Sequence, residues 1–182
     1  MDLVIGLTGP NAAGKGEVAA HLASLGFRIH SLSDIVREEA ARRGLAPDRE
    51  HLIRIGTELR RRGGPGVLAA RILPRLEDRA VVDSIRNPAE VQVLRDGLPR
   101  FVLLGVTAPT EVRFERSVAR ARGGDPATLE EFESVERREN ADDPAAQQLD
   151  ATFRLADLSI NNSGDLAALR AEVDRVLEPL DK

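Results

Sequence analysis

The chain has 182 residues, five phenylalanines, no tryptophan, tyrosine or cysteine, and a formal net charge of -4. This length suits one domain with a sizeable core, and the lack of cysteine excludes disulfides, thiolate zinc sites and cysteine nucleophiles. The slight negative charge argues against a general nucleic-acid or membrane-surface binder, and the few aromatics argue against base stacking on rings. With no membrane-length apolar run and no N-terminal leader, we expect a cytoplasmic protein.

The first predicted elements form a strand, a glycine-rich loop and a helix. The apolar run 3–8 predicts a buried strand, and good helix formers follow from residue 18. Between them, Gly9 to Glu17 reads G-P-N-A-A-G-K-G-E, the layout of a P-loop whose backbone amides hold phosphates. Lys15 is the only lysine besides Lys182, and its compact ammonium can bridge β- and γ-phosphates. The residues expected to bind nucleotide here are Gly9, Asn11, Ala12, Ala13, Gly14, Lys15, Gly16 and Glu17.

Beyond the loop, short apolar runs alternate with helical patterns, which indicates a single α/β domain with a parallel sheet over residues 1–182. Roughly 45 mostly helical residues separate the second and third strands, more than a crossover needs. We therefore expect a helical insert at about 32–78, and a lid at about 116–142 around a glycine break. The predicted strands are 3–8, 27–30, 79–85, 101–106 and 158–162, and the later helices are 31–44, 48–62, 67–76, 88–96, 109–121, 128–140 and 165–177.

Charged residues follow the predicted strands at the edge where ligands bind in open α/β sheets. Asp83 ends the third strand, the position of a carboxylate that orients Mg²⁺ directly or through water. Arg86 comes three residues later and can clamp a second anion. Arg37 lies one helical turn after Asp34 and points from the insert toward the same cleft.

A third group of arginines precedes the glycine break at residues 123–124. An arginine-bearing lid can close over a triphosphate and exclude water during phosphoryl transfer. Arginine is common throughout this chain, so a solvated helix face is an equally good interpretation for any single member. The group consists of Arg113, Arg116, Arg120 and Arg122.

These motifs resemble the P-loop nucleoside monophosphate kinase group, including adenylate and cytidylate kinases, together with phage-type deoxynucleoside monophosphate kinases and dephospho-CoA kinase. The loop has glycine after its lysine, as in adenylate and cytidylate kinases. Asp34 to Arg37 matches a D-x-x-R motif, and Asp83 to Arg86 matches D-G-F-P-R with one residue fewer. The string from Val81 to Val91 is similar to the phage-type D-x-R-x-x-x-E form, and Ser159 to Gly164 to the I-x-N-x-G segment of dephospho-CoA kinase.

The resemblance implies a three-layer fold with strand order 2-3-1-4-5 and an ATP- and Mg²⁺-dependent kinase. Its acceptor would be a small phosphorylated molecule, most simply a nucleoside or deoxynucleoside monophosphate. It implies no nucleic-acid or membrane partner, and a monomer or small homo-oligomer. The implied roles are donor binding by Lys15, Arg116 and Asn162; Mg²⁺ binding through water by Asp83; acceptor binding by Asp34, Arg37 and Arg86; and closure over the transferring group by Arg120 and Arg122.

Two other functions remain open on the sequence. One is a kinase for a coenzyme or other small metabolite such as dephospho-CoA, in which Asp34 would be the base for an acceptor hydroxyl. The other is an ATP-binding switch with weak ATPase activity, favoured by Glu17 where the related kinases carry threonine. A group of kinase-like P-loop proteins without an assigned substrate shares the same layout, and the resemblance extends to it.

Overall fold

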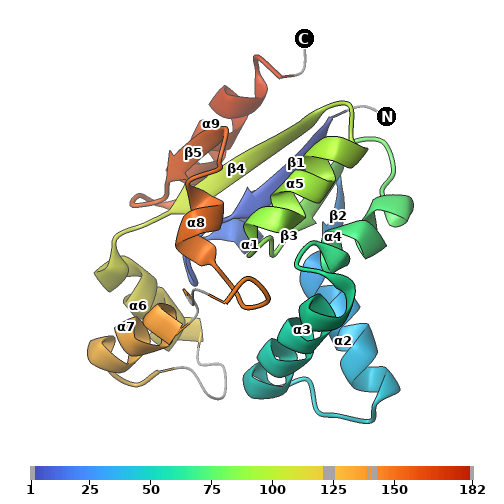
Figure 1. Cartoon of the computed structure of the whole chain (residues 1–182). Helices are drawn as coiled ribbons and strands as arrows, with labels where there is room; N and C mark the ends of the chain where they lie inside the picture. Colours follow the sequence, from blue (N-terminus) through green and yellow to red (C-terminus); the bar gives the residue numbers. More distant parts are fainter. Residues whose placement is uncertain (1–2, 121–125, 139, 141–142, 181–182) are drawn as a thin grey trace.

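The centre of the molecule is a five-stranded parallel sheet in the order β2-β3-β1-β4-β5 (Figure 1). The computed structural model describes residues 3–120, 126–138, 140 and 143–180. Its sheet confirms the α/β class and the strand order expected from the sequence. The strands are β1 (Val4–Thr8), β2 (Arg28–Ser31), β3 (Ala80–Asp83), β4 (Phe101–Thr107) and β5 (Leu158–Asn161).

Strand β1 lies in the middle of the sheet because its residues are apolar, apart from Thr8, whose hydroxyl group donates to the Ile85 carbonyl. All five are buried, and the strand pairs with β3 on one side and β4 on the other. Parallel strands covered on both faces read as continuous apolar runs. The loop from Gly9 to Glu17, predicted to bind phosphate and called the phosphate-binding loop below, therefore starts from a strand fixed on both sides.

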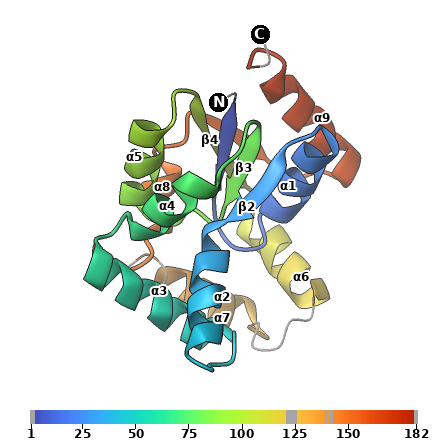
Figure 2. The same cartoon turned by 90° about the vertical axis from the view of Figure 1, so that its right-hand side faces the viewer.

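Helices cover both faces of the sheet and make two separate cores (Figure 2). Helices α1 (Lys15–Ser24) and α9 (Leu166–Leu177) lie together on one face. Helices α4 (Val67–Ile72), α5 (Pro88–Gly97) and α8 (Leu149–Phe153) lie on the other. Neighbouring residues of a strand face opposite cores, as Val81 and Val82 of β3 do.

A helical segment connects β2 to β3. It comprises α2 (Leu32–Arg42), α3 (Arg49–Gly63), α4 and the 3₁₀ turn η1 (Leu73–Arg75). The single helix expected over 67–76 is divided between α4 and η1 because Pro74 has no N–H group to continue the α-helical bonding. The Ser31 side chain caps α2 by accepting from Ser33 N, and the Asp48 side chain caps α3.

Helices α6 (Thr110–Arg120) and α7 (Leu129–Arg138) lie across from α2 and α3, below the sheet in Figure 1. The amphipathic α7 packs Phe132 edge-on against Phe114 of α6, with ring centroids 5.9 Å apart. Among the described residues, none of the helices has both the length and the apolar character needed to cross a membrane.

Candidate active site

The loop between β1 and α1 follows a path that needs two of its glycines. Gly9 and Gly14 have φ values of 134° and 101°, which favour glycine. A Cβ atom on Gly9 would lie 2.0 Å from the Val106 carbonyl oxygen, and one on Gly14 would lie 2.2 Å from Asn162 Nδ2. A Cβ atom on Gly16 would meet nothing within 4 Å. The backbone therefore requires glycine at the first two positions, whereas it leaves space for a side chain at Gly16.

The ammonium group of Lys15 lies against this loop. Its Nζ donates hydrogen bonds of 2.8 Å to the carbonyl oxygens of Gly9 and Pro10. Lys15 is also the first residue of α1, where free backbone N–H groups and the helix dipole favour an anion. The loop thus combines two features that attract phosphate: a lysine and a helix N-terminus.

The end of β5 supports the loop from behind. Asn162 is buried, and its Nδ2 donates a 2.9 Å hydrogen bond to the carbonyl of Ala13. Arg116 of α6 donates 3.0 Å and 3.4 Å bonds to the carbonyls of Asn162 and Gly164. Asn162, predicted to contact nucleotide, is therefore bonded to the phosphate-binding loop itself.

Arg113 connects the same loop to α7. This side chain is buried, donates to the carbonyls of Ala108 and Asn11, and forms an ion pair with Glu136. Its guanidinium also lies over the ring of Phe132, 5.5 Å from the centroid. Arg113 thus ties α6 and α7 to the loop after β1 instead of facing a ligand.

A cavity of about 980 Å³ extends from the phosphate-binding loop to α2 and α3. It therefore brings the lysine, the carboxylate after β3 and arginines from α2, α3, α6 and the loop after β3 to one space. Of the residues predicted from the sequence, those lining it are Asn11, Ala12, Gly14, Lys15, Gly16, Glu17, Arg37, Asp83, Arg86, Arg116 and Arg120.

Four of the predicted residues that the structure describes do not line the cavity. Gly9 and Ala13 are buried within the loop, and Asn162 lies behind it. The Asp34 side chain is 57% exposed and accepts a 2.9 Å hydrogen bond from Arg37. Arg122 lies outside the described residues.

Asp83 has the properties of a carboxylate that meets a cation. It ends β3 and lines the cavity beside the loop. Its Oδ2 accepts a long 3.4 Å hydrogen bond from Ser84 Oγ, while Oδ1 is buried without a hydrogen-bond partner. A buried carboxylate oxygen needs a donor or a metal ion. Mg²⁺ in nucleotide sites is held by one or two carboxylates together with phosphates, so Asp83 fits that role.

A chain of hydroxyl groups connects Asp83 to Arg37. Arg37 Nη1 donates to Ser33 Oγ at 2.6 Å, and Ser33 Oγ lies 2.9 Å from Ser31 Oγ. Ser31 then donates to Ser84 Oγ at 3.2 Å, next to Asp83. Ser84 has a φ of 64°, a conformation that non-glycine residues adopt at a cost and that is enriched at functional sites.

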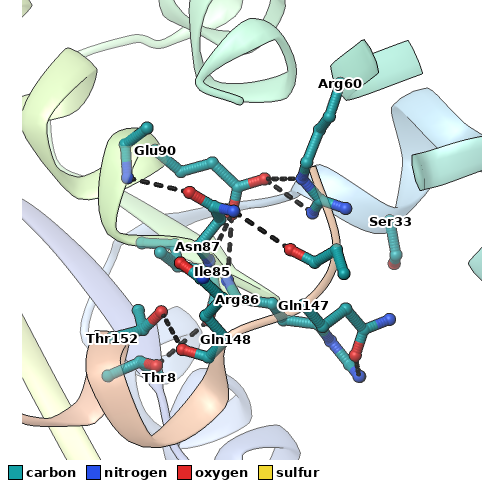
Figure 3. A network of polar contacts seen from close by, with 12 residues as sticks. Thr8, Ser33, Arg60, Ile85, Arg86, Asn87, Glu90, Gln147, Gln148 and Thr152 are labelled. Atoms are coloured by element: carbon teal, nitrogen blue, oxygen red, sulfur yellow. Dashed lines mark hydrogen bonds and ion pairs between the residues drawn. The ribbon is translucent and has the colours of Figure 1, made fainter. Parts of the chain in front are cut away.

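The buried carboxylate of Glu90 organises the loop after β3 (Figure 3). Its Oε2 accepts from the backbone N–H groups of Arg86 and Asn87, at 2.9 Å and 3.1 Å. Its Oε1 accepts from Nε and Nη2 of Arg60 on α3, at 2.9 Å and 2.7 Å. The exposed fractions of the Arg60 and Glu90 side chains are 4% and 0%. One carboxylate therefore joins the wall of the cavity to the loop that carries Arg86.

The segment 143–148 is bonded to the same loop. Arg86 Nη1 donates to Gln147 Oε1 at 2.8 Å, and Gln148 N donates to the Arg86 carbonyl at 2.8 Å. The Asn87 side chain donates to the carbonyls of Pro144 and Ala146. Arg86 is therefore held on both its backbone and its side chain, with its guanidinium at the cavity.

Sequence reasoning did not identify Arg60, Glu90, Ser84 or Gln147 as parts of the site. The R-x-x-x-E spacing from Arg86 to Glu90 was a local signal that the Glu90 carboxylate accepts from backbone N–H groups at the start of α5. Arg60 begins a run of three arginines, and composition alone does not distinguish the buried member from its exposed neighbours. Its partner is 30 residues away in sequence.

Comparison with known protein families and proteins finds sequences similar to this chain over most of its length. A family model described as an AAA domain matches residues 8–133. A UPF0200 protein of Pyrococcus abyssi is 31% identical over 186 residues, covering 98% of this chain and 97% of that protein. A UPF0200/UPF0201 protein of Archaeoglobus fulgidus is 33% identical over 186 residues, and the chain spans 98% of its own length but only 56% of that relative.

Solved structures share the fold. TT1252 from Thermus thermophilus aligns with a TM-score of 0.63 at 27% identity, covering 98% of each chain. Shikimate kinase from Acinetobacter baumannii in complex with shikimate aligns with a TM-score of 0.60, covering 98% of this chain and 93% of the other. Its identity is 16%, so this likeness shows a P-loop kinase-like fold.

Proposed function

The chain belongs to the UPF0200 family and to the AAA domain family, and we propose that it transfers the γ-phosphoryl group of ATP to a nucleoside or deoxynucleoside monophosphate. Proteins named as kinases share its fold, which supports phosphoryl transfer as the reaction class. The acceptor is argued from this chain's own residues. A small molecule is then the substrate, and the working unit is a monomer or small homo-oligomer.

One observation carries the proposal: a single cavity contains a phosphate-binding loop at one side and arginines at the other. Lys15 lies on the loop side, while Arg37 and Arg86 come from α2 and from the loop after β3. Two phosphate groups that must react repel each other, so the site needs cationic groups for both. Asp83 lies among them with a free carboxylate oxygen.

The proposed roles follow from these positions. The loop amides and Lys15 hold the donor phosphates, and Arg116 and Arg120 approach from the lid side. Asp83 would hold Mg²⁺ through water, and the ion would supply positive charge to the phosphate oxygens. Arg86 would hold the acceptor phosphate in line with the donor.

The environment of Asp34 favours a phosphate acceptor over an alcohol. An alcohol acceptor needs a general base within hydrogen-bond reach of its hydroxyl group. Asp34 does not line the cavity and accepts a hydrogen bond from Arg37. A monophosphate oxygen is already anionic at neutral pH, so transfer to it needs no such base.

A panel of acceptors tests the proposal. The full chain is incubated with ATP, Mg²⁺ and each common ribonucleoside or deoxynucleoside monophosphate, or with alcohols such as dephospho-CoA, shikimate and gluconate. Phosphorus NMR then identifies the phosphorylated product. We expect a nucleoside diphosphate. Transfer only to an alcohol would contradict the proposal, and ATP hydrolysis without transfer to any acceptor would indicate a nucleotide-dependent switch instead.

A further inference from the structure

One face of α3 forms a wall of the cavity. Arg49, Leu52, Ile53, Gly56 and Arg60 all line it, and steps of three and four residues place them on one side of the helix. Successive turns of α3 therefore follow the cavity from its N-terminal end to Arg60. Leucine and isoleucine occupy the middle of this wall, so a ligand here meets mostly apolar surface.

Arg60 is the deepest polar group on that wall, and its guanidinium is held in one orientation. Nε and Nη2 both donate to Glu90 Oε1. Glu90 is fully buried and its second oxygen is occupied by two backbone N–H groups. The remaining nitrogen of Arg60, Nη1, makes no hydrogen bond within the described part of the chain. Arg60 lines the cavity, and a guanidinium N–H group donates to an acceptor, so Nη1 is suited to bind a ligand atom there.

The space next to Nη1 is created by a glycine. A Cβ atom on Gly56 would lie 3.5 Å from Arg60 Nη1 and 3.7 Å from Val36 Cγ2. Glycine weakens a helix interior relative to alanine, yet this position is buried within α3. The missing methyl group leaves the approach to Nη1 open from the cavity.

The charge balance defines the chemistry that Nη1 can recognise. Glu90 neutralises the positive charge of Arg60 within a buried ion pair. The free N–H groups therefore suit an uncharged oxygen, such as a ring carbonyl, and they repel an amino group that also presents hydrogens. An apolar wall with one fixed donor matches a flat ring that carries a carbonyl at its edge.

We infer that Arg60 Nη1, exposed through the gap at Gly56, is the specificity-determining contact for the acceptor, selecting a base with a carbonyl oxygen. This inference rests on the proposed function and names its substrate class: monophosphates of keto bases rather than of amino bases. Arg60 contacts the ligand directly, and Glu90 is the positioning residue that fixes its orientation.

Matched pairs of ligands test the selection without any turnover. Inosine and adenosine monophosphates differ in carrying a carbonyl or an amino group at ring position 6, and uridine and cytidine monophosphates differ in the same way at position 4. Calorimetric titration of the full chain, without ATP, gives the dissociation constant of each. We expect the keto member of at least one pair to bind tenfold or more tightly than its amino partner.

Gly56→Ala tests the contact itself. The new methyl group meets its neighbours at ordinary contact distances, leaves the Arg60–Glu90 pair intact and favours the helix. It covers Nη1, so the keto ligand should bind at least tenfold more weakly and the preference should fall to within about threefold. Thr57→Ala is the control, because Thr57 is the next residue of α3 and does not line the cavity; it should keep the wild-type preference.

The outcomes separate this inference from the proposed function. Equal wild-type affinities within both pairs, no binding of any of the four, or an unchanged preference in Gly56→Ala would overturn the role of Arg60. If phosphoryl transfer to keto and amino monophosphates is then equally efficient, the proposed kinase activity is supported without selection of the base by Arg60. A third outcome is selective binding of a keto monophosphate that Gly56→Ala abolishes, without phosphoryl transfer from ATP. This outcome would support the recognition site at Arg60 and contradict the proposed kinase activity.

Discussion

The side chain of Asn162 donates a 2.9 Å hydrogen bond to the backbone carbonyl of Ala13, 149 residues away in sequence. The same residue is bonded through its backbone to Thr107 and Arg116. The last strand therefore fixes the shape of the loop that follows the first strand. Because Asn162 is buried, shortening its side chain leaves the Ala13 carbonyl without its protein donor inside the fold.

Asn162→Ala should lower the free energy of unfolding by about 1–3 kcal/mol, because it leaves the Ala13 carbonyl without its donor. ATP should also bind more weakly, since the loop loses a support. Urea denaturation and calorimetric titration measure the two effects. Asn161→Ala, at the exposed neighbouring position, is the control. Equal behaviour of the two variants would show that the Ala13 contact does not stabilise the loop.

Lys15→Ala should abolish phosphoryl transfer and leave the fold intact. Lys15 Nζ donates to the carbonyls of Gly9 and Pro10 in its own loop, and its charge would meet the donor phosphates there. A coupled assay for ADP release measures activity, and circular dichroism with thermal melting monitors the fold. Wild-type activity in a folded Lys15→Ala protein would refute the assignment of the phosphate-binding loop.

Glu90→Gln should destabilise the protein by about 3–5 kcal/mol. The substitution removes the charge that compensates Arg60, and an unpaired buried charge is costly. The exposed pair Arg28–Glu77, whose side chains are 68% and 52% exposed, provides the control: Glu77→Gln should cost about 1 kcal/mol or less. Urea unfolding of both variants gives the comparison. If Glu90→Gln lowers the free energy of unfolding as little as Glu77→Gln does, the buried pair contributes little to stability.

Asp34→Asn distinguishes phosphate from alcohol acceptors. If the acceptor is a monophosphate, kcat should change less than about tenfold, because Asp34 only orients Arg37 at the edge of the site. A general base normally contributes about 10²–10⁴-fold. Steady-state kinetics of Asp34→Asn with the best acceptor from the panel distinguishes a residue that orients Arg37 from a general base. Asp48→Asn, at the cap of α3, is a matched control for removing one carboxylate charge near the cavity.

His30 should make the stability depend on pH. Burial lowers the pKa of this imidazole from 6.5, outweighing the nearby Glu77 carboxylate, which raises it. Its Nε2 is also buried without a partner. Between the lowered folded pKa and 6.5, the unfolded chain binds more protons than the folded chain. The free energy of unfolding should therefore decrease as the pH falls below about 6.5, with a slope of at most about 1.4 kcal/mol per pH unit from this group.

Urea denaturation between pH 5 and 8 measures this dependence. His30→Gln removes the titrating group, so its stability should change less with pH than that of the wild type. His51→Gln is the comparison, because the His51 side chain is partly exposed and has Asp48 as a carboxylate partner. Parallel pH profiles of wild type and His30→Gln would contradict the prediction.

The sheet could be predicted from sequence because each strand is a short apolar run bounded by turn residues. The loop from Gly9 to Glu17 could be placed for the same reason: its pattern is local and it lies between two predictable elements. Helix ends were less certain, as the early start of α1 at Lys15 shows. A helix begins where capping and backbone geometry permit, and Gly14 in the left-handed conformation supplies that boundary here.

The deeper part of the site could not be predicted, since it depends on pairs far apart in sequence. Arg60 differs from its neighbours Arg61 and Arg62 only because its side chain points into the protein. Its partner Glu90 lies 30 residues later in the sequence, after β3. The role of Asn162 as a support for Ala13 needs the β4–β5 pairing to be known. Such contacts are set by packing of whole elements, for which one sequence carries no direct signal.

Glu90 also sets a length. With one oxygen it holds Arg60, and with the other it holds the backbone of Arg86 and Asn87. The same carboxylate therefore links Arg60, the proposed base contact, to the backbone of Arg86, whose side chain is the proposed phosphate contact. With its base at Arg60, a nucleoside diphosphate would place its terminal phosphate away from Arg86, so under the proposed function we expect the diphosphate to be released instead of phosphorylated again.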